Sequence, residues 1–568
     1  MTKRLGKTAV ATLSLGLVFA MALTGCAPKT DTAGDGGSGD ATKGGTLSFY
    51  IGEPAYIDPY NTQESEGTQV EQALFDSLTA FDALDAVKII PAAADSWEPN
   101  ADASVWTFKL NKDAKFSDGT PVMAKDFVYA WNRIANPATK NTSTGEADPS
   151  VISYHIDKVK GFDEVAAGTA TEMSGVKAVD DYTLEVTLKE SFADFEYVVA
   201  HPALAPVPQK AVEEGVDYNG EMLPYGDFPI GNGPFKMSEP WKRGQYVKVV
   251  QNENYGGEAA NIDGIDFRIF KDPNTAYTEF EAGTLDFCQI GEGKITDAIS
   301  KYGESENGYT ANPGAQSLLG AETAVYYIVA NTKNDVMKDA NIRKAVSYAI
   351  NRQAICDVVF EGTREPADNI VPPGVAGYVP GVWAEAKYDV EAAKKALADA
   401  GYPDGVGAPE LTLTFNNDGG HEKIMQLVQS DLKVIGLTVK FDTADFPTTL
   451  KKYDAGNFQF GRLGWIADYP IMDNFLYPLF FSTSGDNKSA YNNPDIDKQL
   501  DEARKTVDGD ARIAMYQEID KAIGADLPVI PVMFYKHHHI ASDRVHDLTY
   551  SAMGMADFQK VWLEAAAK

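Results

Sequence analysis

Apolar and polar residues alternate along seven short segments with the period of two that is typical of β-strands. These segments span residues 46–52, 105–110, 183–188, 246–251, 265–270, 325–331 and 410–416. Between them, apolar residues recur at helical spacing, which predicts helices at residues 124–134, 342–355, 390–400, 422–435 and 511–522. Because strands and helices alternate along most of the chain, the pattern predicts a mixed α/β fold.

The amino-terminal segment has a different pattern. Lys3, Arg4 and Lys7 precede an apolar run over residues 9–23, which is too short for a membrane span and indicates a secretory signal at residues 1–25. The run ends in LTGC, which resembles the lipobox of bacterial lipoproteins and predicts cleavage before Cys26 and acylation of its thiol. Gly, Asp, Thr and Ala dominate the next residues, so we expect a flexible tether over residues 26–43.

The length and net charge of the chain narrow the class of protein further. A chain of 568 residues is too long for one hydrophobic core, so two or three lobes are expected. The formal net charge of −32, or −35 without the three basic residues of the signal, disfavours nucleic acid and anionic lipid as partners. Only Cys288 and Cys356 follow Cys26, and we expect both to be buried as small apolar residues.

Residues 93–134 combine a strand, the turn SDGTP and an amphipathic helix in a distinctive order. Asp118 and Gly119 suit a tight turn, Pro121 suits the opening of a helix, and Trp131 suits its inner face. F-x-D-G-x-P followed by DF-x-x-x-W resembles the signature of the solute-binding proteins that serve ATP-driven peptide and nickel importers. Other stretches that resemble this family lie at residues 175–190, 201–213, 230–237 and 330–355.

The resemblance implies a two-lobed periplasmic-binding-protein-like fold (type II, cluster C) with an additional small domain and a ligand cleft between the lobes. It places lobe I at residues 44–76, 202–324 and 537–568, the extra domain at residues 77–201 and lobe II at residues 325–536. It also implies a monomeric lipoprotein, held on the outer side of the bacterial cell membrane by Cys26, that captures short peptides and delivers them to the permease subunits of an ABC importer.

The segment GRLGWIADYP at residues 461–470 sets two charges among aromatic residues, where desolvation is costly unless the charges are paired. In the oligopeptide-binding branch of the family, an R-x-G-W-x-A-D-Y segment lies in the cleft. The resemblance implies that Asp468 binds the α-ammonium group of the peptide, that Trp465 forms the wall of a side-chain pocket, and that Arg462 binds a carboxylate. Taken alone, the residues also allow Arg462 and Asp468 to pair with each other and Trp465 to lie in the core.

The resemblance places ten more residues beside the ligand: Gly464, Tyr469, Gln63, Glu64, Ser65, Asn232, Gly233, Tyr326, Tyr535 and Tyr154. The acidic residue that the oligopeptide-binding branch carries at the position of Gln63 is absent, unless Glu64 is its equivalent after a shift of one residue. Tyr154 lies in an insertion that matches the family poorly.

No catalytic or metal-binding motif points to another class. GEGKIT at residues 291–296 lacks the spacing of a phosphate loop, and no G-x-S-x-G nucleophile elbow occurs. The histidines at residues 537–539 would alternate faces if they continued the apolar strand before them, and no Cys or acidic cluster accompanies them. We therefore expect no enzyme, no cofactor and no metal. Two alternatives remain, namely the same fold binding a nickel chelate, haem or a sugar, and a hydrolase or surface adhesin.

Overall fold

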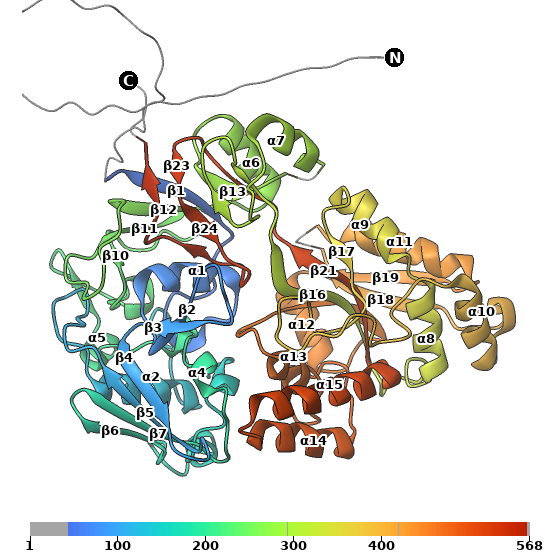
Figure 1. Ribbon diagram of the computed structural model, residues 1–568, viewed down its shortest axis with the longest axis horizontal. Helices are drawn as coiled ribbons and strands as arrows, with labels where there is room; N and C mark the ends of the chain where they lie inside the picture. The colour runs from blue at the N-terminus through green and yellow to red at the C-terminus, as the bar shows by residue number, and fades with distance from the viewer. Residues whose placement is uncertain (1–43, 292, 418–419, 565–568) are drawn as a thin grey trace, which may run out of the picture. The chain divides into compact units, whose positions relative to one another are not determined.

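The computed structural model describes residues 44–291, 293–417 and 420–564 (Figure 1). The predicted signal peptide, Cys26 and the tether lie outside these residues. Three larger sheets, of seven, six and four strands, organise the described part of the chain, which confirms the α/β class. None of the helices in this part is long and apolar enough to cross a membrane.

The seven-stranded sheet brings together strands from three distant parts of the sequence. Its order is β10 (Phe235–Met237), β11 (Tyr246–Gln251), β12 (Gly264–Ile269), β1 (Thr46–Ile51), β13 (Phe287–Gln289), β22 (His539–Ala541) and β15 (Ser317–Leu318). β1 runs parallel to β12 and β13, and the remaining pairs are antiparallel. The helices of this region are α1 (Ser65–Leu74), α6 (Pro273–Glu281) and α7 (Ile295–Tyr302), and α6 and α7 lie beside β13 in Figure 1.

The four-stranded sheet is antiparallel and is covered by helix α2 (Ala124–Ala135). Its order is β4 (Ala94–Pro99), β5 (Val105–Leu110), β7 (Thr183–Thr187) and β6 (Val176–Asp180). Trp131 of α2 is fully buried, and its indole N–H donates to the carbonyl of Leu204 at 2.9 Å. The backbone N–H of Met123 is capped by Asp126, so α2 begins after Met123 and Pro121 precedes the helix instead of opening it.

The six-stranded sheet carries most of the remaining helices. Its order is β17 (Glu365–Pro366), β21 (Val529–Lys536), β16 (Ala321–Ala330), β20 (Phe460–Ile466), β18 (Leu411–Asn416) and β19 (Val439–Ala444). The helices are α8 (Ala340–Ala349), α9 (Arg352–Phe360), α10 (Val390–Asp399), α11 (Glu422–Val434), α12 (Phe446–Asp454), α13 (Met472–Phe480), α14 (Pro494–Lys505) and α15 (Gly509–Asp526).

Smaller elements connect the three sheets. The short helices are α3 (Phe162–Ala166), α4 (Phe195–Val198) and α5 (Gln209–Glu214). The short strands are β2 (Thr79–Phe81), β3 (Ile89–Pro91), β8 (Val216–Tyr218), β9 (Glu221–Leu223), β14 (Thr310–Ala311), β23 (Val545–His546), β24 (Leu548–Tyr550), β25 (Ala556–Asp557) and β26 (Trp562–Leu563).

The prediction of a single helix over residues 342–355 is wrong, because the helical conformation is interrupted between α8 and α9. Ile350 is extended, with ψ of 116°. The side chain of Asn351 then caps α9 by accepting the N–H of Ala354 at 3.1 Å, while its own N–H donates to Asp431 at 2.8 Å. Asn favours helix caps over helix interiors, so the apolar period continues through a residue that starts a new helix.

Two segments link the seven-stranded and six-stranded sheets, and they lie side by side. One joins β15 to β16 and the other joins β21 to β22. Ala321 pairs with Lys536, and the N–H of His537 donates to the carbonyl of Gly320 at 3.0 Å. Strand β21 ends at Lys536, so the three histidines do not continue it; His537 and His538 lie in the crossing between the sheets, and His539 begins β22.

The sheets enclose separate cores. One core is shared by the seven-stranded and four-stranded sheets, a second lies around the six-stranded sheet, and a small third one lies under α6 and α7. Cys288 and Cys356 are buried free thiols, as expected. The domain boundaries expected at residues 76, 201, 324 and 536 stay a prediction.

Candidate ligand-binding site

Strand β20 carries the segment with the unusual charges. It runs antiparallel to β16, so that Arg462 lies opposite Ile328, Gly464 opposite Tyr326 and Trp465 opposite Val325. The strand ends at Ile466, and the N–H of Ala467 donates to the carbonyl of Thr323 at 2.9 Å. The change from strand to loop thus falls within GRLGWIADYP, and Asp468 lies just beyond the strand.

Asp468 is held in place by neutral groups. The side-chain amide of Asn474 donates to Oδ2 at 2.8 Å, and the hydroxyl of Tyr154 donates to Oδ1 at 3.3 Å. Among the described residues, no lysine or arginine lies within ion-pairing distance of Asp468, and its pairing with Arg462 does not occur. Burial raises the pKa of Asp468 to about 6, while the hydrogen bond from Asn474 lowers it. At neutral pH the site therefore holds a carboxylate without a directly paired cation among the described residues, although Lys158 stabilises its charge from a longer distance.

Asn474 positions the carboxylate and was missed by sequence reasoning. Its Oδ1 accepts both the indole N–H of Trp465 at 3.1 Å and the backbone N–H of Asp468 at 3.0 Å. Asn474 is fully buried in α13, so its amide cannot rotate freely. Trp465 is partly buried and packs against the core of the six-stranded sheet. The indole N–H of Trp465 thus holds the Asn474 side chain in place, and Asn474 in turn orients the Asp468 carboxylate.

Arg462 lies at the other end of β20 and contacts only neutral groups among the described residues. Its guanidinium donates to the hydroxyl of Tyr535 at 3.1 Å and to Oδ1 of Asn416 at 3.3 Å, and it lies 4.8 Å from the centre of the Tyr326 ring. Its Nε is buried without a hydrogen-bond partner. Arg462 is therefore a cation whose neighbours in this part of the chain do not neutralise it.

A second buried arginine, which the sequence did not single out, lies beside the first. The guanidinium of Arg364 stacks 4.0 Å from the ring of Phe360 and 4.6 Å from that of Tyr535, and its Nε also lacks a partner. Burial, together with Arg462 and Arg364, lowers the pKa of the nearby His421 to about 2, so its imidazole stays neutral. Two cations thus flank Tyr535.

Gly464 makes room for this arrangement. A Cβ atom at this position would lie 2.7 Å from the hydroxyl oxygen of Tyr535, closer than van der Waals contact allows. The hydroxyl that accepts the hydrogen bond from Arg462 therefore passes over the bare backbone of β20. Tyr326, on the neighbouring strand, is fully buried under the Arg462 guanidinium.

The other predicted residues fall into two groups. Gln63, Ser65 and Asn232 line a cavity that also reaches Asp468, whereas Glu64 turns away and accepts the N–H of Ala55 at 2.8 Å. Asn232 also bonds both backbone groups of Asp76, at 2.9 and 3.0 Å, and Gly233 bonds the carbonyl of Leu74 at 2.8 Å, so both support the end of α1. Tyr469 is buried in the core that the seven-stranded and four-stranded sheets share.

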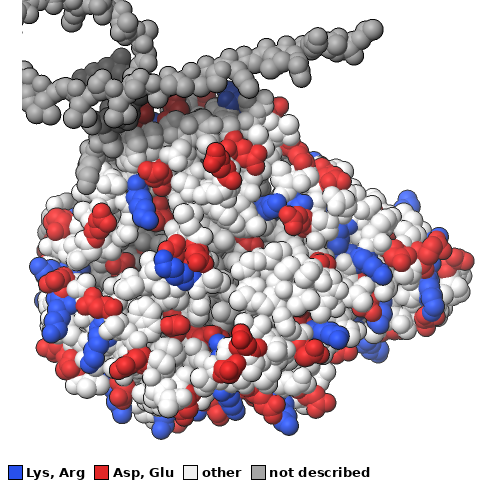
Figure 2. Space-filling view, viewed as in Figure 1, with Lys and Arg blue, Asp and Glu red and all other residues white. Residues whose placement is uncertain are grey.

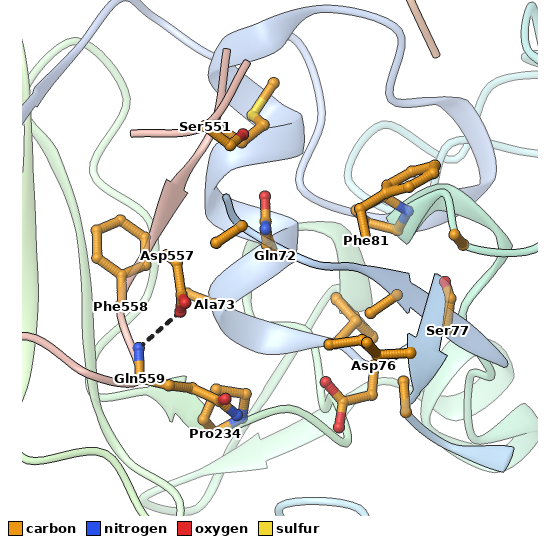
Figure 3. A pocket seen from close by; sticks show the side chains of 18 of the residues that line it. Gln72, Ala73, Asp76, Ser77, Phe81, Pro234, Ser551, Asp557, Phe558 and Gln559 are labelled. Atoms are coloured by element: carbon orange, nitrogen blue, oxygen red, sulfur yellow. Dashed lines mark hydrogen bonds between the residues drawn. The ribbon is translucent and has the colours of Figure 1, made fainter. Parts of the chain in front are cut away.

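The cavity has a volume of about 970 Å³. Figure 3 shows the part that is bordered by Gln72 and Ala73 of α1, by Asp76 and Ser77, and by the carboxyl-terminal residues Asp557 to Gln559. Acidic residues exceed basic ones in the lining, with Asp76, Asp82, Asp95, Glu258, Asp468, Asp547 and Asp557 against Lys560. On the face of the molecule in Figure 2, by contrast, acidic and basic side chains are mixed. The negative charge therefore distinguishes the cavity from this outer face, and it favours a cationic group.

Comparison with known proteins identifies the class. Residues 88–487 match the model of the bacterial extracellular solute-binding proteins, family 5, middle region, and the chain therefore belongs to this family. It is an extracytoplasmic solute-binding protein with the two-lobed architecture of periplasmic peptide-binding proteins.

Individual relatives show how far the similarity extends in sequence and in structure. The chain is 30% identical to the periplasmic oligopeptide-binding protein OppA of Escherichia coli K12, over 84% of this chain and 85% of that protein. It is 26% identical to the oligopeptide-binding protein OppA of Bacillus subtilis, over 97% and 99% of the two chains. A crystal structure of Haemophilus influenzae OppA in complex with the peptide RPPGFSPFR superimposes with a TM-score of 0.75 at 25% identity, over 92% of this chain and 99% of that one.

Proposed function

We propose that this protein captures short peptides with a free amino terminus in the cavity beside β20 and delivers them to the permease of an ABC importer. The observation that carries the proposal is the Asp468 carboxylate, which lines a cavity and has no cationic partner among the described residues. A peptide ammonium group supplies the missing charge. Two unit charges about 4 Å apart attract by about 4 kcal/mol at an effective dielectric of 20, before desolvation is subtracted.

The opposite end of β20 suits the carboxylate of the same peptide. Arg462 and Arg364 present guanidinium groups there, and the Nε of each has no hydrogen-bond partner in the described part of the chain. A guanidinium binds a carboxylate through two parallel hydrogen bonds, which neutral ligands cannot reproduce. One strand thus has an anion at one end and cations at the other, which fits a zwitterionic ligand better than a sugar.

The decisive test of the amino-terminal contact is calorimetry with a peptide and its N-acetylated twin. We expect the free peptide to bind at least about tenfold more tightly, because acetylation removes the positive charge opposite Asp468. Asp468→Asn should lose this preference and keep the wild-type melting temperature. Equal affinities of the wild type for the two peptides would refute the role of Asp468.

Native mass spectrometry of the protein as purified tests the ligand class. A cleft that closes over its ligand retains molecules from the cells, so a ladder of peptide masses is expected. A single mass of a nickel chelate, haem or a sugar would favour the alternative ligands instead, and conversion of a bound peptide to fragments would favour a hydrolase. We propose that this protein has no enzymatic activity.

The remaining parts of the proposal concern placement in the cell. Acylated Cys26 would anchor the protein to the membrane, and residues 26–43 would let the binding domain reach the permease as a monomer. In this proposal, residues 44–76, 202–324 and 537–568 form lobe I, residues 77–201 the extra domain, and residues 325–536 lobe II. Radiolabelled palmitate in the wild type and its loss in Cys26→Ala would test the anchor.

A further inference from the structure

Three residues that are distant in the sequence meet at the amino-terminal end of the site. His155 precedes α3, His201 precedes the segment that leads to α5, and Asp468 follows β20. One ligand atom from each of them lies within 4.8 Å of the others. Their separation along the chain explains why no metal-ligand spacing was visible in the sequence.

His155 has an environment that is rare for an imidazole. The residue is fully buried, and neither Nδ1 nor Nε2 has a hydrogen-bond partner among the residues that the structure describes. Its ring packs 4.3 Å from that of Tyr154 and 4.5 Å from that of His201. Buried polar atoms in folded proteins almost always have a partner, so these two nitrogens point to a group that the protein itself does not supply.

Each imidazole can offer a ring nitrogen to a metal ion. In His201, Nδ1 accepts the N–H of Ala203 at 3.2 Å, which leaves Nε2 for the ion. Coordination through Nε2 moves the ring proton to Nδ1 and breaks this long hydrogen bond. The stacked rings of His155 and His201 must also turn, because an imidazole nitrogen binds an ion in the plane of its ring, so both changes are costs of binding.

Asp468 completes the donor set with a carboxylate that is already oriented. Asn474 holds Oδ2, whereas Oδ1 has only the 3.3 Å contact with Tyr154. Two imidazoles and one carboxylate form the three-ligand set of open zinc sites, in which outer hydrogen bonds orient the ligands. We propose that His155, His201 and Asp468 bind a divalent transition-metal ion of the zinc type.

The shared carboxylate has a consequence for transport. An ion on Asp468 occupies the place that the peptide ammonium would take, so zinc and peptide should exclude each other. This consequence rests on the proposed function, whereas the metal site does not.

The test is calorimetric titration of zinc chloride into the whole chain freed of bound peptide, in a buffer that does not chelate metals. We expect one ion per wild-type molecule and at least about tenfold weaker binding by His155→Phe, which keeps a flat ring between Tyr154 and His201. The control is His546→Asn, because His546 lies elsewhere, stacked on Trp562, and should leave the zinc affinity unchanged. No binding by the wild type, or equal binding by His155→Phe, would overturn the proposal.

Cobalt(II) gives a second readout that weak surface binding does not imitate. We expect the wild type to shift and intensify the visible absorption of the ion, and His201→Gln, used also if His155→Phe does not fold, to abolish this change. An unaltered spectrum in the wild type would contradict coordination by the three residues. Peptide titration of the same preparation separates the two proposals, because a protein that binds peptide but no zinc refutes only the metal site.

Discussion

Gly464 shows how one missing side chain shapes the site, because the Tyr535 hydroxyl occupies the space that a Cβ atom would fill. Gly464→Ala should displace this hydroxyl and break its 3.1 Å bond with Arg462. We expect about tenfold weaker peptide binding by calorimetry, with a folded protein by circular dichroism. Gly485→Ala is the control, because a Cβ atom added there would have no other atom within 4 Å. Equal losses in both variants would contradict this account.

Glu322 provides a test of pH dependence at the crossing segments. Burial raises its pKa from 4.5 to about 7, and Arg364 lowers it. Between pH 4.5 and about pH 7, Glu322 has lost its proton in the unfolded chain but keeps it in the folded chain. The contribution of Glu322 to stability is therefore greatest below pH 4.5 and is lost as the pH rises through about 7. The difference corresponds to about 3 kcal/mol.

Urea unfolding of Glu322→Gln at pH 5 and pH 8 measures this effect. Gln carries no charge at either pH, so the variant should gain stability relative to the wild type as the pH rises, by up to about 3 kcal/mol. Comparison with the wild type removes the opposite trend of the neighbouring His537, whose pKa burial lowers to about 4. Glu365→Gln, at a largely exposed carboxylate, is the control. A difference that stays constant with pH would refute the assignment.

At the scale of elements, the break between α8 and α9 depends on one cap. Asn351→Ala removes the side chain that accepts the N–H of Ala354 at 3.1 Å, and we expect the free energy of unfolding to fall by about 1 kcal/mol. Gln353→Ala, on the exposed face of α9, should change it by less than about 0.5 kcal/mol. If chemical denaturation gave the same stability for Asn351→Ala and wild type, the break would have another cause.

At the scale of the whole molecule, one buried ion pair joins the four-stranded region to the six-stranded one. Arg512 of α15 lies 2.7 Å from Asp194, and both side chains are almost fully buried. Arg512→Met leaves a buried carboxylate without its cation, which typically costs about 3–5 kcal/mol. We expect weaker peptide binding and a larger radius of gyration by small-angle X-ray scattering, because the two regions lose a contact that holds them together.

An exposed ion pair across the same boundary is the matched control. Lys505 lies 3.2 Å from Glu190, and both side chains are largely in solvent. Exposed pairs contribute about 0–1 kcal/mol, so Lys505→Met should change neither the affinity nor the scattering curve measurably. Equal effects of the two substitutions would show that net charge, and not the buried pair, governs closure.

Much of the fold was predictable because strands and helices with one buried face carry a period in the sequence. Strands β5, β11 and β18 and helices α2, α10, α11 and α15 follow such periods. The break at Asn351 was not predicted, because the apolar period passes through it without interruption. Within the candidate site, the GRLGWIADYP segment stood out because charged residues among aromatic ones are unusual, and the family resemblance supplied the roles expected of its residues. Asn474, Arg364 and His155 were missed, since each is an ordinary residue of its own element.

The sequence alone determined the α/β class, the likeness to solute-binding proteins, and the candidate charges Arg462 and Asp468. Local patterns suffice for these features, because periodicity and short motifs are properties of neighbouring residues. Only the tertiary structure decided that Asp468 and Arg462 do not pair with each other and that His155 and His201 meet at Asp468. These outcomes depend on contacts such as those of Arg462 with Tyr535, 73 positions away, and of Asp468 with Tyr154, 314 positions away, which no local pattern encodes.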